Sequence, residues 1–233
     1  MIQSPNPYKL LMFDLDGVLL DFHDAEAVAL SSAFQLAGIP FREAWLDRYR
    51  EVNTRFWKAF EAGTVSAEQI KEDRFPMFLA EIGIDADPVV MSRDYLAGLA
   101  GCSTLLGDPF PLLRILGERL PMALITNGVK SVQEPRLASS GLDRFFSPIV
   151  ISEDVGVAKP HPVIFERVLD HHPGVKRDQV LMIGDSLSSD IAGAHAAGLD
   201  SCWYNPSGTR RTEDEPAPTY TISRLEHILD ILS

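Results

Sequence analysis

The chain has 233 residues, enough for a large core domain and a smaller second one. Its 33 acidic residues outnumber the 21 basic ones, which gives a formal net charge of −12. A surface this acidic repels polyanions, so we do not expect DNA or RNA as a partner. A small anionic substrate is compatible with this charge, because a metal ion and a few local cations can bind it.

Cysteine content and hydropathy restrict the cellular setting. Cys102 and Cys202 are too few for a disulfide framework and lack metal-ligand spacing, and each has apolar or small neighbours, so we expect buried free thiols. Residues 1–7 lack the basic and hydrophobic regions of a signal peptide, and the longest apolar runs are too short to span a membrane. We therefore expect a soluble cytoplasmic protein without a membrane partner; no feature predicts its oligomeric state.

The first predicted element is a strand over residues 10–13, an apolar run typical of a parallel strand covered on both faces. It leads directly into Asp14-Leu15-Asp16-Gly17-Val18. In open α/β sheets, ligands bind beyond the carboxyl ends of the strands. Two neighbouring carboxylates are costly to bury unless a cation compensates them. Taken alone, the pair is explained as well by a solvated turn.

Residues 21–100 contain no predicted strand and form an all-helical insertion. The first helix covers residues 25–37, and the third begins with a capping box of Ser66 and Gln69 and runs to about residue 82. Asp87 starts a fourth. The second helix is indicated by an apolar stripe, assigned to the core of the bundle, whose members are Trp45, Tyr49, Val52, Phe56 and Phe60.

Four further apolar runs, each followed by small or polar residues, continue the pattern of the first strand. They cover residues 122–125, 149–151, 180–183 and 201–204, and helical stretches separate most of them. This alternation predicts an α/β fold with a doubly wound parallel sheet. The sheet domain comprises residues 1–20 and 101–233, and the inserted helical domain comprises residues 21–100. Residues 209–218 are expected to form an exposed loop.

Polar residues at the ends of these strands make a consistent site for phosphoryl transfer, which depends mostly on positioning and charge neutralisation. Asp14 offers a nucleophilic carboxylate, and Asp16 can transfer a proton. Asp185 and Asp190 supply the hard oxygen ligands that Mg²⁺ prefers. Uncharged donors and a positive charge come from Thr126, Asn127 and Lys159.

Each later segment also has a simpler structural explanation. Residues 126–128 could form only a turn, Lys159 could be an exposed residue before a proline, and Asp190 could favour a helix N-terminus. Chance rarely places all of them, in this order, at one edge of one sheet. Together they favour the catalytic interpretation.

These segments also carry a resemblance, over almost the whole chain, to phosphatases of the haloacid dehalogenase (HAD) superfamily. The four motifs of the superfamily correspond to residues 14–18, 125–128, 159–160 and 184–190. The helical insertion corresponds to the cap that the superfamily inserts after its first motif. The resemblance implies a Rossmann-like HAD core with an all-helical cap.

The resemblance implies a Mg²⁺-dependent phosphomonoester hydrolase that works through an aspartyl-phosphate. Asp14 would be the nucleophile and Asp16 the general acid and base. Thr126, with the backbone around Asn127, would bind the transferring phosphoryl group, and Lys159 would neutralise that group and the nucleophile.

The resemblance also implies the metal ligands. Mg²⁺ would be held by the Asp14 carboxylate, the Asp16 main-chain carbonyl and Asp185, and Asp190 would act through water or a neighbouring contact. The dehalogenases that gave the superfamily its name lack an aspartate equivalent to Asp16. A 2-haloacid dehalogenase is therefore disfavoured.

For the substrate, the chain is most similar to HAD-type pyrimidine 5′-nucleotidases, which hydrolyse nucleoside monophosphates. Asn53, Trp57 and Arg74 are placed either to contact a base or sugar or to hold the bundle together. We expect a 5′-nucleotidase whose partner is a small phosphorylated metabolite, preferably a pyrimidine nucleoside monophosphate. The similar segments are residues 52–57, 63–64, 74–75 and 151–160.

Several alternatives stay open at this point. A phosphatase for sugar phosphates, phosphoglycolate or acylneuraminate phosphate shares parts of the same core segments, and a phosphomutase belongs to the same superfamily. A non-catalytic binding protein of this fold would be expected to lose some of the key residues. All of them are present, namely Asp14, Asp16, Lys159 and Asp185.

Overall fold

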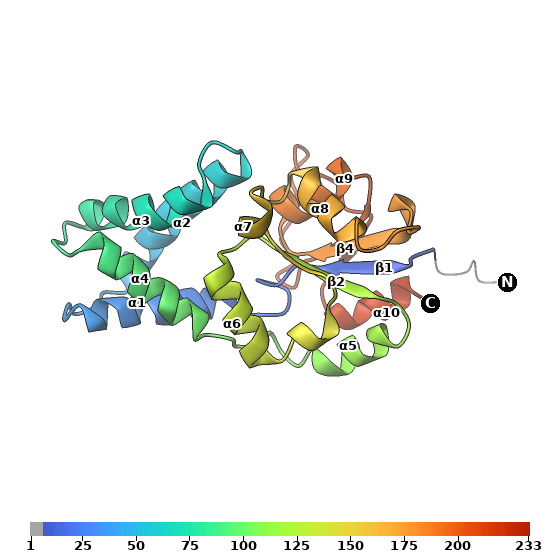
Figure 1. The fold of residues 1–233 in the computed structure, drawn as a ribbon, viewed down its shortest axis with the longest axis horizontal. Helices are drawn as coiled ribbons and strands as arrows, with labels where there is room; N and C mark the ends of the chain where they lie inside the picture. The colour runs from blue at the N-terminus through green and yellow to red at the C-terminus, as the bar shows by residue number, and fades with distance from the viewer. Residues whose placement is uncertain (1–6) are drawn as a thin grey trace.

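A six-stranded parallel sheet lies at the centre of the computed structural model, which describes residues 7–233 (Figure 1). We expect no signal peptide in residues 1–7, and residues 1–6 of this segment lie outside the described residues. The strand order is β3-β2-β1-β4-β5-β6. The strands are β1 Leu10–Phe13, β2 Met122–Thr126, β3 Ile149–Ile151, β4 Val180–Gly184, β5 Asp200–Tyr204 and β6 Tyr220–Ile222.

The central strand β1 is buried along its whole length, as its unbroken apolar run predicts. It pairs with β2 on one side and with β4 on the other, so that Phe13 stands level with Leu124 and Ile183. From β1 the chain builds the sheet outward through β2 and β3, and then returns to start β4 beside β1. This reversal of strand order is where α/β sheets open a crevice for ligands.

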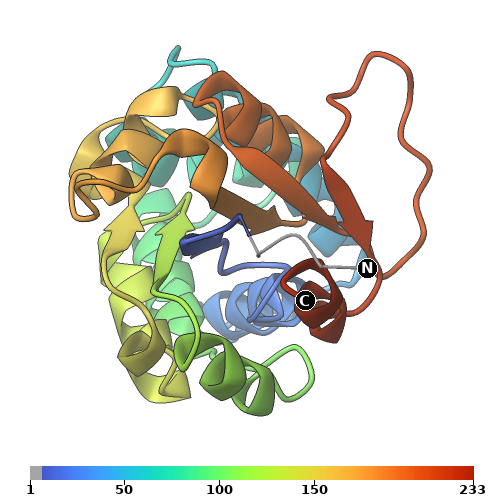
Figure 2. The same cartoon turned by 90° about the vertical axis from the view of Figure 1, so that its right-hand side faces the viewer.

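Helices cover both faces of the sheet (Figure 2). Alternate side chains of β1 belong to the apolar clusters on opposite faces. Leu11 and Phe13 pack with α5 and α10, whereas Leu10 and Met12 pack with α8 and α9. The doubly wound parallel sheet is thus confirmed. The helices around it are α5 Phe110–Gly117, α6 Lys130–Ser140, α7 Ser152–Val155, α8 Pro162–Leu169, α9 Ala192–Ala196 and α10 Ile228–Ile231.

The predicted helical insertion contains four helices, at the left of Figure 1. These are α1 Phe22–Leu36, α2 Ala44–Glu61, α3 Ala67–Ile82 and α4 Pro88–Ala100. The capping box of Ser66 and Gln69 and the Asp87 N-cap are confirmed. The apolar stripe packs inside the bundle, where the Tyr49 ring contacts the rings of Phe75, Phe78 and Tyr95.

The helical unit and the sheet share one packed seam. Val129 and Val132, at the start of α6, and Ala158 belong to the same apolar cluster as the inside of the helical bundle. The cavity described below opens beside this seam. No helix within residues 7–233 combines the length and the apolar character needed to cross a membrane.

The five predicted strands are confirmed to within one residue, but β6 was not predicted. It has three residues, of which only Ile222 is buried, so it carries no apolar run that would identify it. The loop before it is exposed as expected and extends away from the sheet in Figure 2. Both cysteines are free and Cys202 is buried, as expected, but Cys102 is only half-buried because it lies in the segment that follows α4.

Candidate active site

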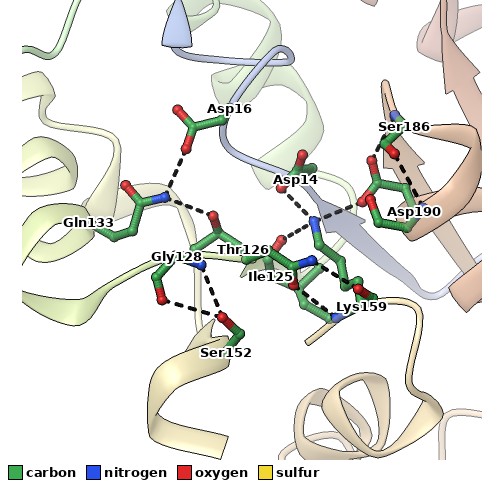
Figure 3. A network of polar contacts seen from close by, with 12 residues as sticks. Asp14, Asp16, Ile125, Thr126, Gly128, Gln133, Ser152, Lys159, Ser186 and Asp190 are labelled. Carbon is green, nitrogen blue, oxygen red and sulfur yellow. Dashed lines mark hydrogen bonds and ion pairs between the residues drawn. The ribbon is translucent and has the colours of Figure 1, made fainter. Parts of the chain in front are cut away.

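Lys159 is the centre of the polar cluster at the carboxyl end of the sheet (Figure 3). Its side chain is almost completely buried, and Nζ lies 2.6 Å from Asp14 Oδ1 and 2.7 Å from Asp190 Oδ1. Nζ also donates a hydrogen bond of 3.0 Å to the Ile125 carbonyl. Burial alone would lower the pKa of Lys159, but the two carboxylates outweigh it and raise this pKa. Lys159 is therefore held as a cation.

The segment that carries Lys159 is attached to the loop after β2 by the Asn127 side chain. The Asn127 carbonyl oxygen Oδ1 accepts from the Lys159 backbone N–H at 2.8 Å, and its Nδ2 donates to the Lys159 carbonyl at 2.9 Å. A buried Ser152 hydroxyl accepts from the Gly128 backbone N–H at 3.0 Å. These contacts fix the relative position of two segments that are far apart in the sequence.

Asp14, Asp185 and Asp190 form an acidic cluster whose ligand oxygens lie within 4.8 Å of one another. Burial, followed by the charge of Asp190, raises the pKa of Asp14 more than Lys159 lowers it. Asp185 is partly exposed, but the surrounding protein removes some of the water from its carboxylate. This loss of hydration, followed by the charge of Asp190, raises the pKa of Asp185 to about 7. One lysine does not balance three carboxylates, and hard oxygens at this spacing suit a divalent cation.

Asp190 is held firmly in this cluster. It is fully buried, and its Oδ2 accepts a hydrogen bond of 3.0 Å from the Ser186 backbone N–H. A Cβ at Gly184 would lie 2.3 Å from Asp190 Cγ, so only glycine leaves room for this side chain. Gly184 thus permits the close approach of the Asp190 side chain to the end of β4, within the fourth motif.

The Asp16 side chain turns toward α6 and away from Lys159 (Figure 3). Gln133 Nε2 donates to Asp16 Oδ2 at 2.8 Å and to Thr126 Oγ1 at 3.0 Å. Arg136 Nη1 lies 2.7 Å from Asp16 Oδ1, in an ion pair with a buried guanidinium. Neither Gln133 nor Arg136 was predicted as a site residue. Their spacing of three residues on α6, just after the Thr126 segment, is the signal that could have found them.

A cavity of about 240 Å³ lies between the site and the helical unit. Its polar end is formed by Asp14, Asp16 and Lys159, and the apolar lining includes Trp57 and Leu99. The cavity is smaller than typical drug-sized ligand sites of roughly 300–1,000 Å³, so it suits a small ligand.

For three residues of the helical unit, the sequence did not decide between contact with the substrate and a structural role, and these residues differ in position. Trp57 and Arg74 line the cavity, whereas Asn53 is buried behind Arg74 and accepts a hydrogen bond of 2.8 Å from its Nη1. Glu61, at the end of α2, also lines the cavity, and burial is the main cause that raises its pKa. Glu61 was not predicted.

The structure thus brings all the predicted site residues to one edge of the sheet, and their individual roles stay a prediction. Some lie around Lys159 and others around Gln133, at the two ends of the same network. The residues are Asp14, Asp16, Thr126, Asn127, Lys159, Asp185 and Asp190.

The sheet order, the acidic site at its reversal point and the helical unit inserted after β1 define a class of α/β hydrolases. Within that class, the family model for haloacid dehalogenase-like hydrolases matches residues 8–198, and the chain belongs to this family. The chain is a phosphatase, because its full-length relatives include enzymes named as 5′-nucleotidases.

Three relatives match nearly the full length of the chain. HAD-hydrolase YfnB of Bacillus subtilis is 37% identical over 97% of this chain and 96% of its own, and its crystal structure superposes with a TM-score of 0.89 over 97% of this chain and 99% of that one. Pyrimidine 5′-nucleotidase PynA of Streptococcus pneumoniae is 35% identical, over 97% and 95% of the two chains. Pyrimidine 5′-nucleotidase YjjG of Escherichia coli is 31% identical, over 95% and 96%.

Proposed function

We propose that the protein is a Mg²⁺-dependent phosphomonoester hydrolase that forms an aspartyl-phosphate on Asp14 and acts on pyrimidine nucleoside monophosphates. The observation that carries this proposal is the buried Lys159, which pairs with Asp14 and Asp190 within an acidic cluster at the polar end of a small cavity. The names of PynA and YjjG support the choice of substrate.

The proposed reaction has two steps. A carboxylate oxygen of Asp14 attacks phosphorus, the bond from phosphorus to the ester oxygen breaks, and Asp16 gives its proton to the departing oxygen. Asp16 then takes a proton from a water molecule whose oxygen attacks phosphorus. The bond to Asp14 breaks, inorganic phosphate leaves, and both carboxyl groups return to their starting state. Lys159 and Thr126 hold the phosphoryl oxygens throughout.

The proposed Mg²⁺ ligands are the carboxylates of Asp14 and Asp185 and the main-chain carbonyl of Asp16. Asp190, whose two oxygens contact Lys159 and the Ser186 backbone N–H, acts through water or a neighbouring contact. A bound divalent ion supplies positive charge that offsets the crowded carboxylates and the charge on the phosphoryl oxygens. The acidic cluster and the raised pKa values of Asp14 and Asp185 support this assignment. The crystal structure of YfnB is described as bound to magnesium.

We propose residues 21–100 as a cap over a catalytic core of residues 1–20 and 101–233. The apolar cluster of the helical unit, which takes all but three of its buried members from residues 25–99, supports this division, and so does the position of the cavity between the two parts. Interdomain movement is described for YfnB. For this chain we propose hinges near residues 21–23 and 100–103, and a cytoplasmic location consistent with its composition.

A panel of monophosphates with Mg²⁺ tests this function. The panel contains uridine, cytidine and thymidine monophosphates beside ribose 5-phosphate, glyceraldehyde 3-phosphate, phosphoglycolate and acylneuraminate phosphate. We expect at least one pyrimidine nucleotide to exceed each of the four non-nucleotide esters by about tenfold in kcat/KM. This factor corresponds to about 1.4 kcal/mol in the transition state. A sugar phosphate that leads by the same factor would overturn the nucleotidase assignment.

The same assays test the reaction type and the metal. Inorganic phosphate should appear in step with the free nucleoside, whereas a phosphomutase would give an isomeric phosphate ester instead. EDTA should abolish turnover and added Mg²⁺ should restore it. Undiminished turnover in EDTA would overturn the metal requirement.

A further inference from the structure

Arg136 connects the Asp16 carboxylate with the segment that links the helical unit to the sheet. Its side chain is 1% exposed, and Nη1 forms the ion pair of 2.7 Å with Asp16 Oδ1. On its other edge, Nε donates a hydrogen bond of 2.9 Å to the carbonyl of Cys102. Cys102 lies just after α4, where the chain leaves the helical unit. One buried side chain therefore contacts both the Asp16 carboxylate and the linker.

Gln133 completes the arrangement on the same face of α6. Arg136 Nη1 donates to Gln133 Oε1 at 2.8 Å, and Gln133 Nε2 donates to Asp16 Oδ2 at 2.8 Å. Each oxygen of Asp16 is thus held by a different side chain of α6. Because two contacts fix a planar carboxylate where one does not, the orientation of Asp16 depends on α6.

A flexible cation could not make the same set of contacts. The guanidinium is planar and carries its N–H groups in fixed directions, so Asp16, Gln133 and the Cys102 carbonyl are all held in one geometry. Lysine in the same place offers one ammonium nitrogen on a flexible stem, and it does not span the Asp16 carboxylate and the linker at once. The arrangement therefore points to a specific task for arginine at this position.

We propose that Arg136 is a positioning residue that orients Asp16 for proton transfer and ties this orientation to the linker at residues 100–103. Movement of the helical unit displaces the Cys102 carbonyl, and this shifts the Arg136 side chain that contacts the Asp16 carboxylate. This inference rests on the proposed function, because it takes Asp16 as the proton-transferring group of that reaction. It adds a coupling between the position of the cap and the first chemical step.

The test measures release of the leaving group in a single turnover, with enzyme in excess, because this isolates the first step. One substrate is uridine monophosphate, whose leaving oxygen needs a proton, and the other is p-nitrophenyl phosphate, whose phenolate departs without one. We expect Arg136→Met to slow release of uridine by about tenfold or more, and release of p-nitrophenolate by less than about threefold. Arg136→Lys should give an intermediate loss for uridine.

Double mutants and a control separate positioning from a general structural effect. Asp16→Asn should show the same selectivity for uridine release, and Arg136→Met should add little in the Asp16→Asn background, since neighbours acting through one group are not additive. Lys130→Met removes an exposed cation from the same helix and should change neither rate by more than about threefold. Thermal melts establish that each variant is folded.

The link to the hinge has its own readout in the two free thiols. Burial raises the pKa of Cys102 and the Arg136 charge opposes this rise, so loss of the charge also reduces the thiolate fraction, and the alkylation rate is compared per thiolate from its pH dependence. On that basis, loss of the Arg136 contact should speed alkylation of the half-buried Cys102 several-fold and leave the buried Cys202, whose pKa burial raises to about 12, unreactive. This measurement needs no catalytic activity. It therefore tests the linker contact even if a variant loses all turnover.

The outcomes separate the inference from the function on which it rests. Equal loss with both substrates in Arg136→Met, or a loss that adds in full to that of Asp16→Asn, would overturn the positioning role. Unchanged Cys102 labelling per thiolate would overturn the tie to the linker. If Asp16→Asn itself does not distinguish the two substrates, the proposed role of Asp16 fails, and the inference falls with it.

Discussion

At the scale of single residues, glycines allow the close approach of the loops that form the acidic cluster. Gly17, with φ of +80°, lies in the turn after β1, and a Cβ there would lie 2.2 Å from Asp185 Oδ2. The loop of the first motif therefore rests directly against an acidic residue of the fourth. Gly38 has a similar φ of +71°, but a Cβ there would meet nothing within 4 Å, so this glycine offers a matched control.

We expect Gly17→Ala to cost more stability than Gly38→Ala, by denaturant unfolding. Both variants force an L residue into a left-handed conformation, at about 1–3 kcal/mol, but only Gly17→Ala also pushes against Asp185. The Mg²⁺ concentration for half-maximal activity should rise in Gly17→Ala alone. Equal losses of stability with unchanged metal dependence would show that this contact does not matter.

At the scale of elements, a buried polar chain connects three helices of the helical unit. Arg50 of α2 pairs with Glu26 of α1 at 2.8 Å, Glu26 accepts from Asn53 at 3.0 Å, and Asn53 accepts from Arg74 of α3 at 2.8 Å. The aromatic rings of Tyr49 and Tyr95 lie 5.6 and 5.0 Å from the Arg74 guanidinium. The chain of contacts sets Arg74 against the cavity, and Asn53 is its connecting member.

Asn53→Ala should lower the free energy of unfolding by about 1–3 kcal/mol, because it leaves buried groups of Glu26 and Arg74 without a partner. The adjacent exposed Thr54 is the control, and Thr54→Ala should stay within about 0.5 kcal/mol of the wild type. Urea unfolding measures both. If the two variants differed by less than their experimental error, the polar chain would have no structural importance.

At the scale of the whole molecule, the helical unit and the sheet meet across the cavity, and Glu61 is an acid of the helical unit that lines it. Burial, to which the Asp190 charge adds, raises the pKa of Glu61 from its ordinary value of 4.5, against smaller opposing effects of Lys159 and Asn127. The folded protein thus holds the Glu61 proton to higher pH than the unfolded chain. This contribution to stability is complete below pH 4.5 and is lost as the pH rises through the folded pKa.

Glu61→Gln should remove this loss, because the amide stays neutral. Relative to the wild type, the variant should gain stability progressively as the pH rises from 4.5, in unfolding experiments with EDTA present. Glu51→Gln, an exposed position on the same helix, controls for removal of one negative charge. Parallel stability curves for wild type and Glu61→Gln across this range would contradict the assignment.

The sequence predicted the parts of the fold that leave a repeated local pattern. The buried run of β1 and the caps at Ser66 and Asp87 needed no knowledge of distant contacts, whereas β6 lacks an apolar run of its own. In the site, the carboxylates stood out because they follow strands directly. Glu61 did not, because only tertiary packing brings the end of α2 to the cavity, and for Gln133 and Arg136 the local signal was no more than their spacing of three residues on one helix.

The measurement that tests the central claim most directly is chemical trapping of the phosphoryl group on Asp14. In Asp16→Asn with p-nitrophenyl phosphate and Mg²⁺, the first step needs no proton, whereas the second lacks the group that activates water, so the intermediate should accumulate. After an acid quench, we expect a hydroxylamine-sensitive phosphate on the peptide that contains Asp14, and none once Asp14 is also changed to Asn. Release of p-nitrophenolate with no phosphate on Asp14 at any quench time, or with phosphate on another residue, would contradict the account.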